Sequence, residues 1–153
     1  MKLKTDSLSK VLYVMIILAL VILTGVIIGL PWVTKFVLEG STFYSIINHT
    51  EILVLFYITG IPTWIILWMT KILSENIIKR EPFSESSMFS LKSISICALI
   101  IFMCYLCVCL FLSATLGVIG ITLGAFMISL ISAIMYRLVQ VAVEIQKENE
   151  LTI

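Results

Sequence analysis

The sequence predicts an all-α fold, a polytopic membrane protein whose four transmembrane helices form a bundle and extend into the cytoplasm. Hydrophobic residues make up 61% of the 153 residues and charged residues only 12%, whereas a soluble domain carries about 25% charged residues. The charges also gather between four apolar runs, each about as long as a bilayer core is thick. We therefore expect residues 1–153 to form a single membrane domain.

The first span is predicted over residues 11–30, an uninterrupted apolar run. At about 1.5 Å per residue a helix of this length is about 30 Å long, which matches a bilayer core. No small-residue cleavage site follows it, so we interpret it as an uncleaved span rather than a signal peptide. Pro31 and Trp32 are expected to close it, and residues 31–51 to form an outer loop whose aromatic residues suit a membrane interface.

The second span is predicted over residues 52–70, with Gly60 and Pro62 near its middle. Proline has no amide proton and its ring clashes with the preceding helical turn, so a kink is expected there. The kink would free a backbone carbonyl, which has no water to bond in a membrane. We expect the hydroxyl of Thr59 or Thr63 to satisfy that carbonyl.

A charged hairpin, residues 71–93, is predicted between the second and third spans, on the cytoplasmic side. Because proline cannot continue the preceding helix, that helix should end at about Glu81, just before Pro82. Ser84 is placed to cap the next helix with its hydroxyl. Glu85 would then occupy the first helical position, where a negative charge meets the positive end of the helix dipole. The segment combines a helix stop with a helix start.

The third and fourth spans are predicted over residues 94–114 and 118–136. The fourth helix is expected to continue into a cytoplasmic tail, residues 137–153. Four polar residues of this tail recur every three or four positions, which places them on one stripe of a helix: Arg137, Gln140, Glu144 and Lys147.

The distribution of basic residues predicts the orientation of the chain. Every Lys and Arg except Lys35 lies in the N-terminal tail, in the segment 71–93 or in the C-terminal tail. Basic segments stay on the cytoplasmic side of a membrane. We therefore expect both termini and the hairpin to be cytoplasmic.

Two small-xxx-small patterns, Gly25 with Gly29 and Gly120 with Gly124, occur near the outer ends of the first and fourth spans. Such patterns let helix backbones approach closely. They favour packing of these two spans against each other. A homodimer contact and chance occurrence remain alternatives.

The four apolar runs contain no Asp, Glu, Lys, Arg or His. Ion-coupled transporters and intramembrane enzymes normally need such groups at depth, so neither class is expected. Four cysteines cluster in the third span, but no histidine or carboxylate accompanies them there, and cysteine packs well in apolar interiors. We expect no catalytic site, metal or cofactor, and no direct binding of nucleic acid. The cysteines are Cys97, Cys104, Cys107 and Cys109.

Two motifs of this chain resemble those of a bacterial family of small four-span membrane proteins that is classed as a domain of unknown function. The first is the segment 77–93, with its core Glu81-Pro82-Phe83-Ser84 and the later Leu91-Lys92-Ser93-Ile94. The second is the acidic C-terminus Glu148-Asn149-Glu150-Leu151-Thr152-Ile153. One departure is Arg80-Glu81, where the family more often has a glycine before the Pro-Phe pair. The resemblance implies a four-span fold and brings no catalytic residues.

Members of that family are often encoded beside a small helix-turn-helix regulator, so the resemblance implies a role as that regulator's partner in the bacterial plasma membrane. We therefore predict a non-enzymatic regulatory or interaction protein that acts through its cytoplasmic hairpin and C-terminal helix. The alternative is a small channel, carrier or toxin-immunity protein, which the predicted kink in the second span favours. The residues predicted to carry the interaction are Lys79, Arg80, Glu81, Pro82, Phe83, Glu144, Glu148, Glu150, Leu151 and Ile153.

Overall fold

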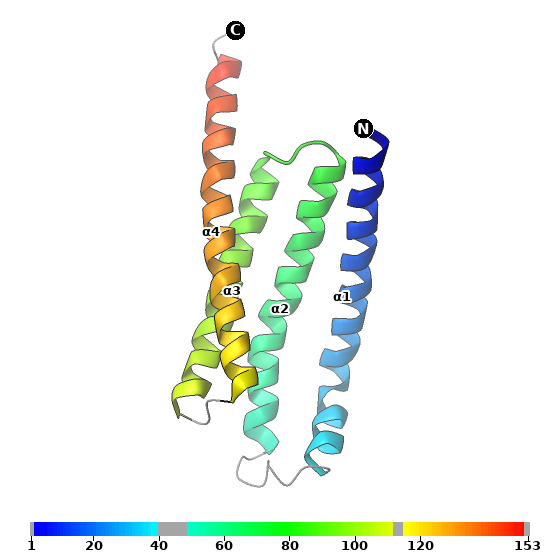
Figure 1. Ribbon diagram of the computed structural model, residues 1–153, viewed down its shortest axis with the longest axis vertical. Helices are drawn as coiled ribbons and strands as arrows, with labels where there is room; N and C mark the ends of the chain where they lie inside the picture. The colour runs from blue at the N-terminus through cyan, green and yellow to red at the C-terminus, as the bar shows by residue number, and fades with distance from the viewer. Residues whose placement is uncertain (1, 40–48, 112–114, 152–153) are drawn as a thin grey trace.

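Four long α-helices make up the computed structural model, which describes residues 2–39, 49–111 and 115–151 (Figure 1). They are α1 (Lys2–Glu39), α2 (His49–Ile78), α3 (Glu85–Phe111) and α4 (Leu116–Leu151). Each contains a segment that is long and apolar enough to cross a membrane. The predicted all-α, four-span fold is confirmed.

The helices pack in chain order, α1 against α2, α2 against α3 and α3 against α4. The start of α1, the α2–α3 turn and the end of α4 all lie at the same end of the molecule (Figure 1). We call this the hinge end. The last turns of α4 extend well past the α2–α3 turn (Figure 1).

Large apolar side chains cover the outside of the helices. Examples are Val21, Ile28 and Leu110, each more than half exposed. Water would be a poor solvent for such a surface, whereas lipid tails solvate it well. The outer surface is therefore the lipid-facing surface.

Helix α1 does not end at Pro31 but continues to Glu39, so the prediction of a loop beginning at residue 31 is wrong. The hydroxyl of Thr34, one turn further on, donates to the carbonyl of Leu30 at 2.8 Å. Proline removes one helical hydrogen bond, whereas ending the helix would leave up to four carbonyls unpaired where water is scarce. Helix α2 likewise begins at His49, inside the predicted loop. Residues 40–48 of that loop lie outside the described residues.

Helix α2 continues through Pro62, which leaves the carbonyl of Ile58 without its usual amide partner. The predicted rescue of this carbonyl by a threonine is wrong. Thr59 donates to the carbonyl of Leu55 at 2.9 Å and Thr63 donates to the carbonyl of Thr59 at 2.7 Å. A hydroxyl has one proton to donate, so neither bonds to Ile58. A bend at Gly60 and Pro62 stays a prediction.

Several long polar and aromatic side chains join helices α1 and α2. The indole N–H of Trp64 donates to the hydroxyl of Thr24 at 3.1 Å, and Trp64 stacks on Trp68 with ring centroids 5.4 Å apart. Nearer the hinge end, the hydroxyl of Tyr13 donates to the carboxylate of Glu75 at 2.9 Å. Lys71 connects these two groups of contacts, since its ammonium lies 3.3 Å from the Glu75 carboxylate and 5.0 Å from the Trp68 ring centroid.

Helices α3 and α4 meet through small residues. The hydroxyl of Ser95 donates to the carbonyl of Ser129 at 3.1 Å, and the hydroxyl of Ser129 donates back to the carbonyl of Ser95 at 3.1 Å. Short side chains reach the backbone of the opposite helix only when the two helices lie close together. The buried residues of α4 recur every three or four positions from Thr122 to Ser132 and resume one heptad later: Thr122, Ala125, Ser129, Ser132, Val139 and Val143.

The two glycine pairs do not bring α1 and α4 together, so that packing prediction is wrong. A Cβ built on Gly25, Gly120 or Gly124 would meet no atom within 4 Å, and one on Gly29 would touch only Val33 of its own helix. The serine contact with α3 occupies the other side of α4, which leaves its glycines facing outward. The third span also ends slightly earlier than predicted, because α3 ends at Phe111 and residues 112–114 lie outside the described residues.

Candidate functional site

The turn between α2 and α3 is held by two backbone hydrogen bonds. The amide of Arg80 donates to the carbonyl of Ile77 at 3.1 Å, and the amide of Glu81 donates to the carbonyl of Asn76 at 2.9 Å. This pair of bonds is the Schellman motif that closes helix C-termini, with Arg80 at its left-handed position. The φ of Arg80 is 63°, where glycine is usual because it has no Cβ to clash.

Side chains then join the end of α2 to the start of α3. The amide of Ser87 donates to the hydroxyl of Ser84 at 3.3 Å, which confirms the predicted N-cap. The side-chain amide of Asn76 donates to the hydroxyl of Ser87 at 3.0 Å, and the two serine hydroxyls lie 3.1 Å apart. Ser87 is fully buried. The turn is therefore fixed from both helices rather than by its backbone alone.

A hydrophobic cluster lies beneath this turn and includes α4. Its buried members are Leu91 of α3 with Val139 and Val143 of α4. Leu73 of α2, Met88 of α3 and Tyr136 of α4 pack against them. Three helices therefore share one hydrophobic core at the hinge end, and this core holds the helix ends together.

An ion pair adds a second link between the turn and α4. The Lys147 ammonium lies 2.6 Å from the Glu85 carboxylate, and both side chains are well exposed. Helix α3 is about 40 Å long, so its polar first turns extend past a bilayer core of about 30 Å. In this aqueous position the hydrogen bond from Lys147 lowers the pKa of Glu85, and the positive charge of the ammonium lowers it further.

The exposed side of the α4 end carries a chain of hydrogen bonds along the helix. Arg137 donates to the side-chain oxygen of Gln140 at 3.4 Å, and Gln140 donates to the carboxylate of Glu144 at 2.9 Å. Lys147, the fourth residue of the predicted stripe, instead reaches Glu85 on α3. We call the α2–α3 turn, the shared core and this part of α4 the hinge platform, residues 73–91 and 136–149.

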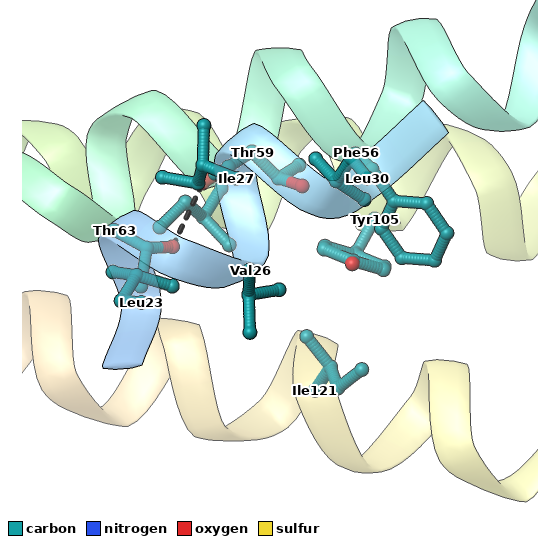
Figure 2. A pocket seen from close by; sticks show the side chains of 11 residues that line it. Leu23, Val26, Ile27, Leu30, Phe56, Thr59, Thr63, Tyr105 and Ile121 are labelled. Atoms are coloured by element: carbon teal, nitrogen blue, oxygen red, sulfur yellow. Dashed lines mark hydrogen bonds between the residues drawn. The ribbon is translucent and has the colours of Figure 1, made fainter. Parts of the chain in front are cut away.

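A separate apolar groove opens between the helices nearer the other end, with a volume of about 190 Å³. Figure 2 shows Val26 of α1 and Ile121 of α4 facing each other across it, with Phe56, Thr59 and Thr63 of α2 behind. Both threonine hydroxyls donate within α2. The groove wall is therefore mostly apolar, and it also includes the hydroxyl-bearing side chain of Tyr105.

Comparison with known proteins identifies the family of this chain. The family model described as Protein of unknown function (DUF2975) matches residues 8–153, which is nearly the whole chain. The chain belongs to this family. No curated protein and no solved structure matches it. The resemblance predicted from the two motifs is thereby confirmed, and the chain is a membrane-spanning helical protein of the DUF2975 family.

In this DUF2975 protein the predicted interaction residues lie at the hinge end. Lys79, Arg80, Glu81, Pro82 and Phe83 are exposed in the turn, and Glu144 and Glu148 are exposed on α4. Glu150 and Leu151 belong to the α4 backbone, but their side chains lie outside the described part, as does all of Ile153. Glu85 and Lys147, which were not among the predicted residues, link the turn to α4.

Sequence reasoning missed the residues that build the platform. Asn76 and Ser87 gave no motif, because their pairing depends on how the turn folds back. The core residues Leu91, Val139 and Val143 could have been found from their spacing, since they belong to stripes with a period of about 3.5 residues. Among the residues that the structure describes, no cluster of His, Cys, Asp or Glu is arranged to hold a metal.

Proposed function

We propose that this protein is a non-enzymatic membrane protein that binds a cytoplasmic regulatory partner through its hinge platform. The observation that carries the proposal is the platform itself, in which the ends of three helices share a core and an ion pair joins α3 to α4. Helix ends that served only to anchor the spans would need no such core. A rigid surface of this kind is what a binding partner requires.

The distribution of charge supports a cytoplasmic platform. Lys71, Lys79, Arg80 and Lys92 flank the turn, and Arg137 and Lys147 lie on the part of α4 beside it. Basic residues are retained on the cytoplasmic side. The orientation is tested with Phe83→Cys in a chain lacking its four native cysteines. An impermeant thiol label added to intact cells should not modify it, and labelling before lysis would overturn the orientation.

The chemistry of the exposed surface indicates a protein partner. Phe83 is 55% exposed and Phe89 is 62% exposed, and both lie in the polar segment outside the bilayer core. Exposed aromatic residues beside arginine are typical of binding hot spots. The family resemblance implies that the partner is a small helix-turn-helix regulator, which would bind DNA while this chain does not.

Photo-crosslinking in the native host tests the interaction. A photoreactive residue replacing Lys79 should trap a soluble protein, and Phe83→Ala in the same chain should reduce the yield several-fold. Removal of residues 148–153 should also reduce it. The matched control is Phe111→Ala, a fully exposed phenylalanine at the opposite end of α3. Equal yields from all four chains would contradict the proposal.

The apolar groove is the structural basis for the alternative of a channel or carrier in the part of the chain that the structure describes. That groove lies near Gly60 and holds no charged residue among its lining side chains. We therefore favour the interaction protein. Flux of ions or small solutes into vesicles containing only the purified chain would overturn this choice, because a pore needs no soluble partner.

A further inference from the structure

Helix α4 carries a second stripe on the side opposite α3. The buried residues that face α3 and the exposed residues of this stripe lie roughly 150° apart around a helix with 3.6 residues per turn. The stripe recurs every three or four residues, which is the spacing of the a and d positions of a coiled coil. Its members are all exposed: Gly117, Gly120, Gly124, Met127, Ile131, Ile134, Leu138, Val141 and Ile145.

The part of the stripe on the hinge platform is apolar although it lies beyond the bilayer. Leu138, Val141 and Ile145 are 59%, 52% and 53% exposed, and they follow Arg137, where the apolar run ends. Side chains that face lipid need no further partner, but these three would face water. A contiguous apolar strip on an aqueous helix is typical of a binding surface.

The part of the stripe before Arg137 has its three glycines at one end, followed by Met127, Ile131 and Ile134. A Cβ added at Gly117, Gly120 or Gly124 would meet nothing within 4 Å. A neighbouring helix could therefore approach the α4 backbone closely at this depth, as small residues in membrane helices allow. The two parts are continuous, and no charged residue interrupts them over about 42 Å of helix.

The continuity of the stripe restricts what can cover it. An occupant that covers the whole stripe has to be a helix that crosses the bilayer and then extends into water on the same side, with a seam of the same period. A soluble protein could cover only the part after Arg137. We propose that the occupant is α4 of a second copy of this chain, paired in parallel along the stripe.

The flanking residues are compatible with such a pair. Arg137 and Glu144 lie on one side of the seam, and Met135 and Ala142 lie on the other. In a parallel pair each flank meets the opposite flank of its partner, so each charge faces an uncharged residue and no like charges meet. Membrane insertion gives both copies the same direction. The pairing holds whichever side of the membrane the platform occupies, so it does not depend on the proposed function.

Disulfide trapping in the full-length chain tests the pairing. In a chain without its four native cysteines, Val141→Cys should form a dimer under mild oxidation in dilute lipid vesicles. The matched control is Gln146→Cys, which is equally accessible but off the seam; it should crosslink at least five-fold less. Equal crosslinking at both sites would indicate random collision and overturn the proposal, as would the absence of a Val141→Cys dimer.

A second variant separates a membrane-deep pair from a contact confined to the platform. Gly124→Leu fills the backbone gap and should lower the Val141→Cys crosslink several-fold. The control is Gly25→Leu on α1, which has the same open space around it and should leave the yield unchanged. No effect of Gly124→Leu would overturn the pairing along the stripe, and loss with Gly25→Leu instead would place the contact on α1. Subunit counting by photobleaching should give two copies; one or three would contradict the pair.

Discussion

The α1–α2 contact and the α3–α4 contact are held together in different ways. Between α1 and α2, long side chains such as Trp64 and Tyr13 reach across to polar atoms of the other helix. Between α3 and α4, Ser95 and Ser129 bond directly to the opposite backbone. The first contact uses large groups that can adjust, whereas the second requires closely packed backbones that cannot. The two contacts should therefore respond differently to the same kind of substitution.

The closely packed contact should be the more sensitive to added volume. Ala98 is 1% exposed in α3, which packs against both α2 and α4, so Ala98→Phe must move α3 away from a neighbouring helix or distort the helices. We expect the free energy of unfolding in detergent to fall by about 3 kcal/mol. The matched control is Leu99→Phe, next to it on the lipid-facing side and 48% exposed. A similar loss in both variants would show that the two helices are not packed as closely as the serine bonds indicate.

The aromatic contact should lose less stability when it is truncated. Trp64→Leu removes the hydrogen bond to Thr24 and the stacking on Trp68, and should lower the free energy of unfolding by about 1.5 kcal/mol. Thr24→Val removes only the hydrogen bond and should cost about 0.6 kcal/mol. A double variant that costs the sum of the two single variants would mean that the bond contributes nothing to joining α1 and α2.

The turn that joins the two helix pairs should gain stability from a glycine. Because Arg80 has φ 63°, Arg80→Gly relieves the clash of its Cβ and should raise the free energy of unfolding by about 1 kcal/mol. Lys79→Gly, one residue earlier and without this φ, should give no gain. A loss of stability with Arg80→Gly would mean that the arginine side chain stabilises the turn by more than its backbone costs.

The ion pair between the turn and α4 should have the smallest effect, visible in titration rather than in unfolding. The pKa of Glu85 is held below its ordinary value by Lys147, so the link is complete above the ordinary glutamate pKa of about 4.3. It is lost as pH falls through the lower pKa of the folded protein. Lys147→Gln should move the carboxyl pKa upward in an NMR titration. An unchanged pKa would show that the pair does not persist in solution.

The features of this fold that could be predicted from the sequence are those that depend on neighbouring residues rather than on distant ones. The cap at Ser84 depends on neighbouring residues alone and is confirmed. By contrast, α2 ends at Ile78, three residues before the predicted Glu81, because Arg80 already takes the left-handed position that closes the helix. Pro31 suggested a helix end by a local rule as well, but the surrounding membrane makes an ended helix costlier than a missing bond. The local rule therefore failed at Pro31, where the surrounding membrane rather than the neighbouring residues determines whether the helix continues.

The contacts between helices were harder to predict than the helices. The Gly120–Gly124 pattern indicated that a backbone could approach, but nothing in one sequence says which backbone. The pairs of Trp64 with Thr24 and of Asn76 with Ser87 join residues whose proximity depends on packing and on the turn. The periodic small residues of α4, from Thr122 to Ser132, were visible in the sequence and would have identified this face of α4 as a packing face, although not α3 as its partner.

Because α4 is long and uninterrupted, a small change in its tilt would move its end by a large distance. From Leu116 to Leu151 the helix has no internal proline, and 36 residues amount to about 54 Å. Helices tilt when the bilayer becomes thinner than their apolar length. A tilt of only about 10° about one end would displace the other by about 9 Å at this length. A change in bilayer thickness would thereby become a movement of the end of α4.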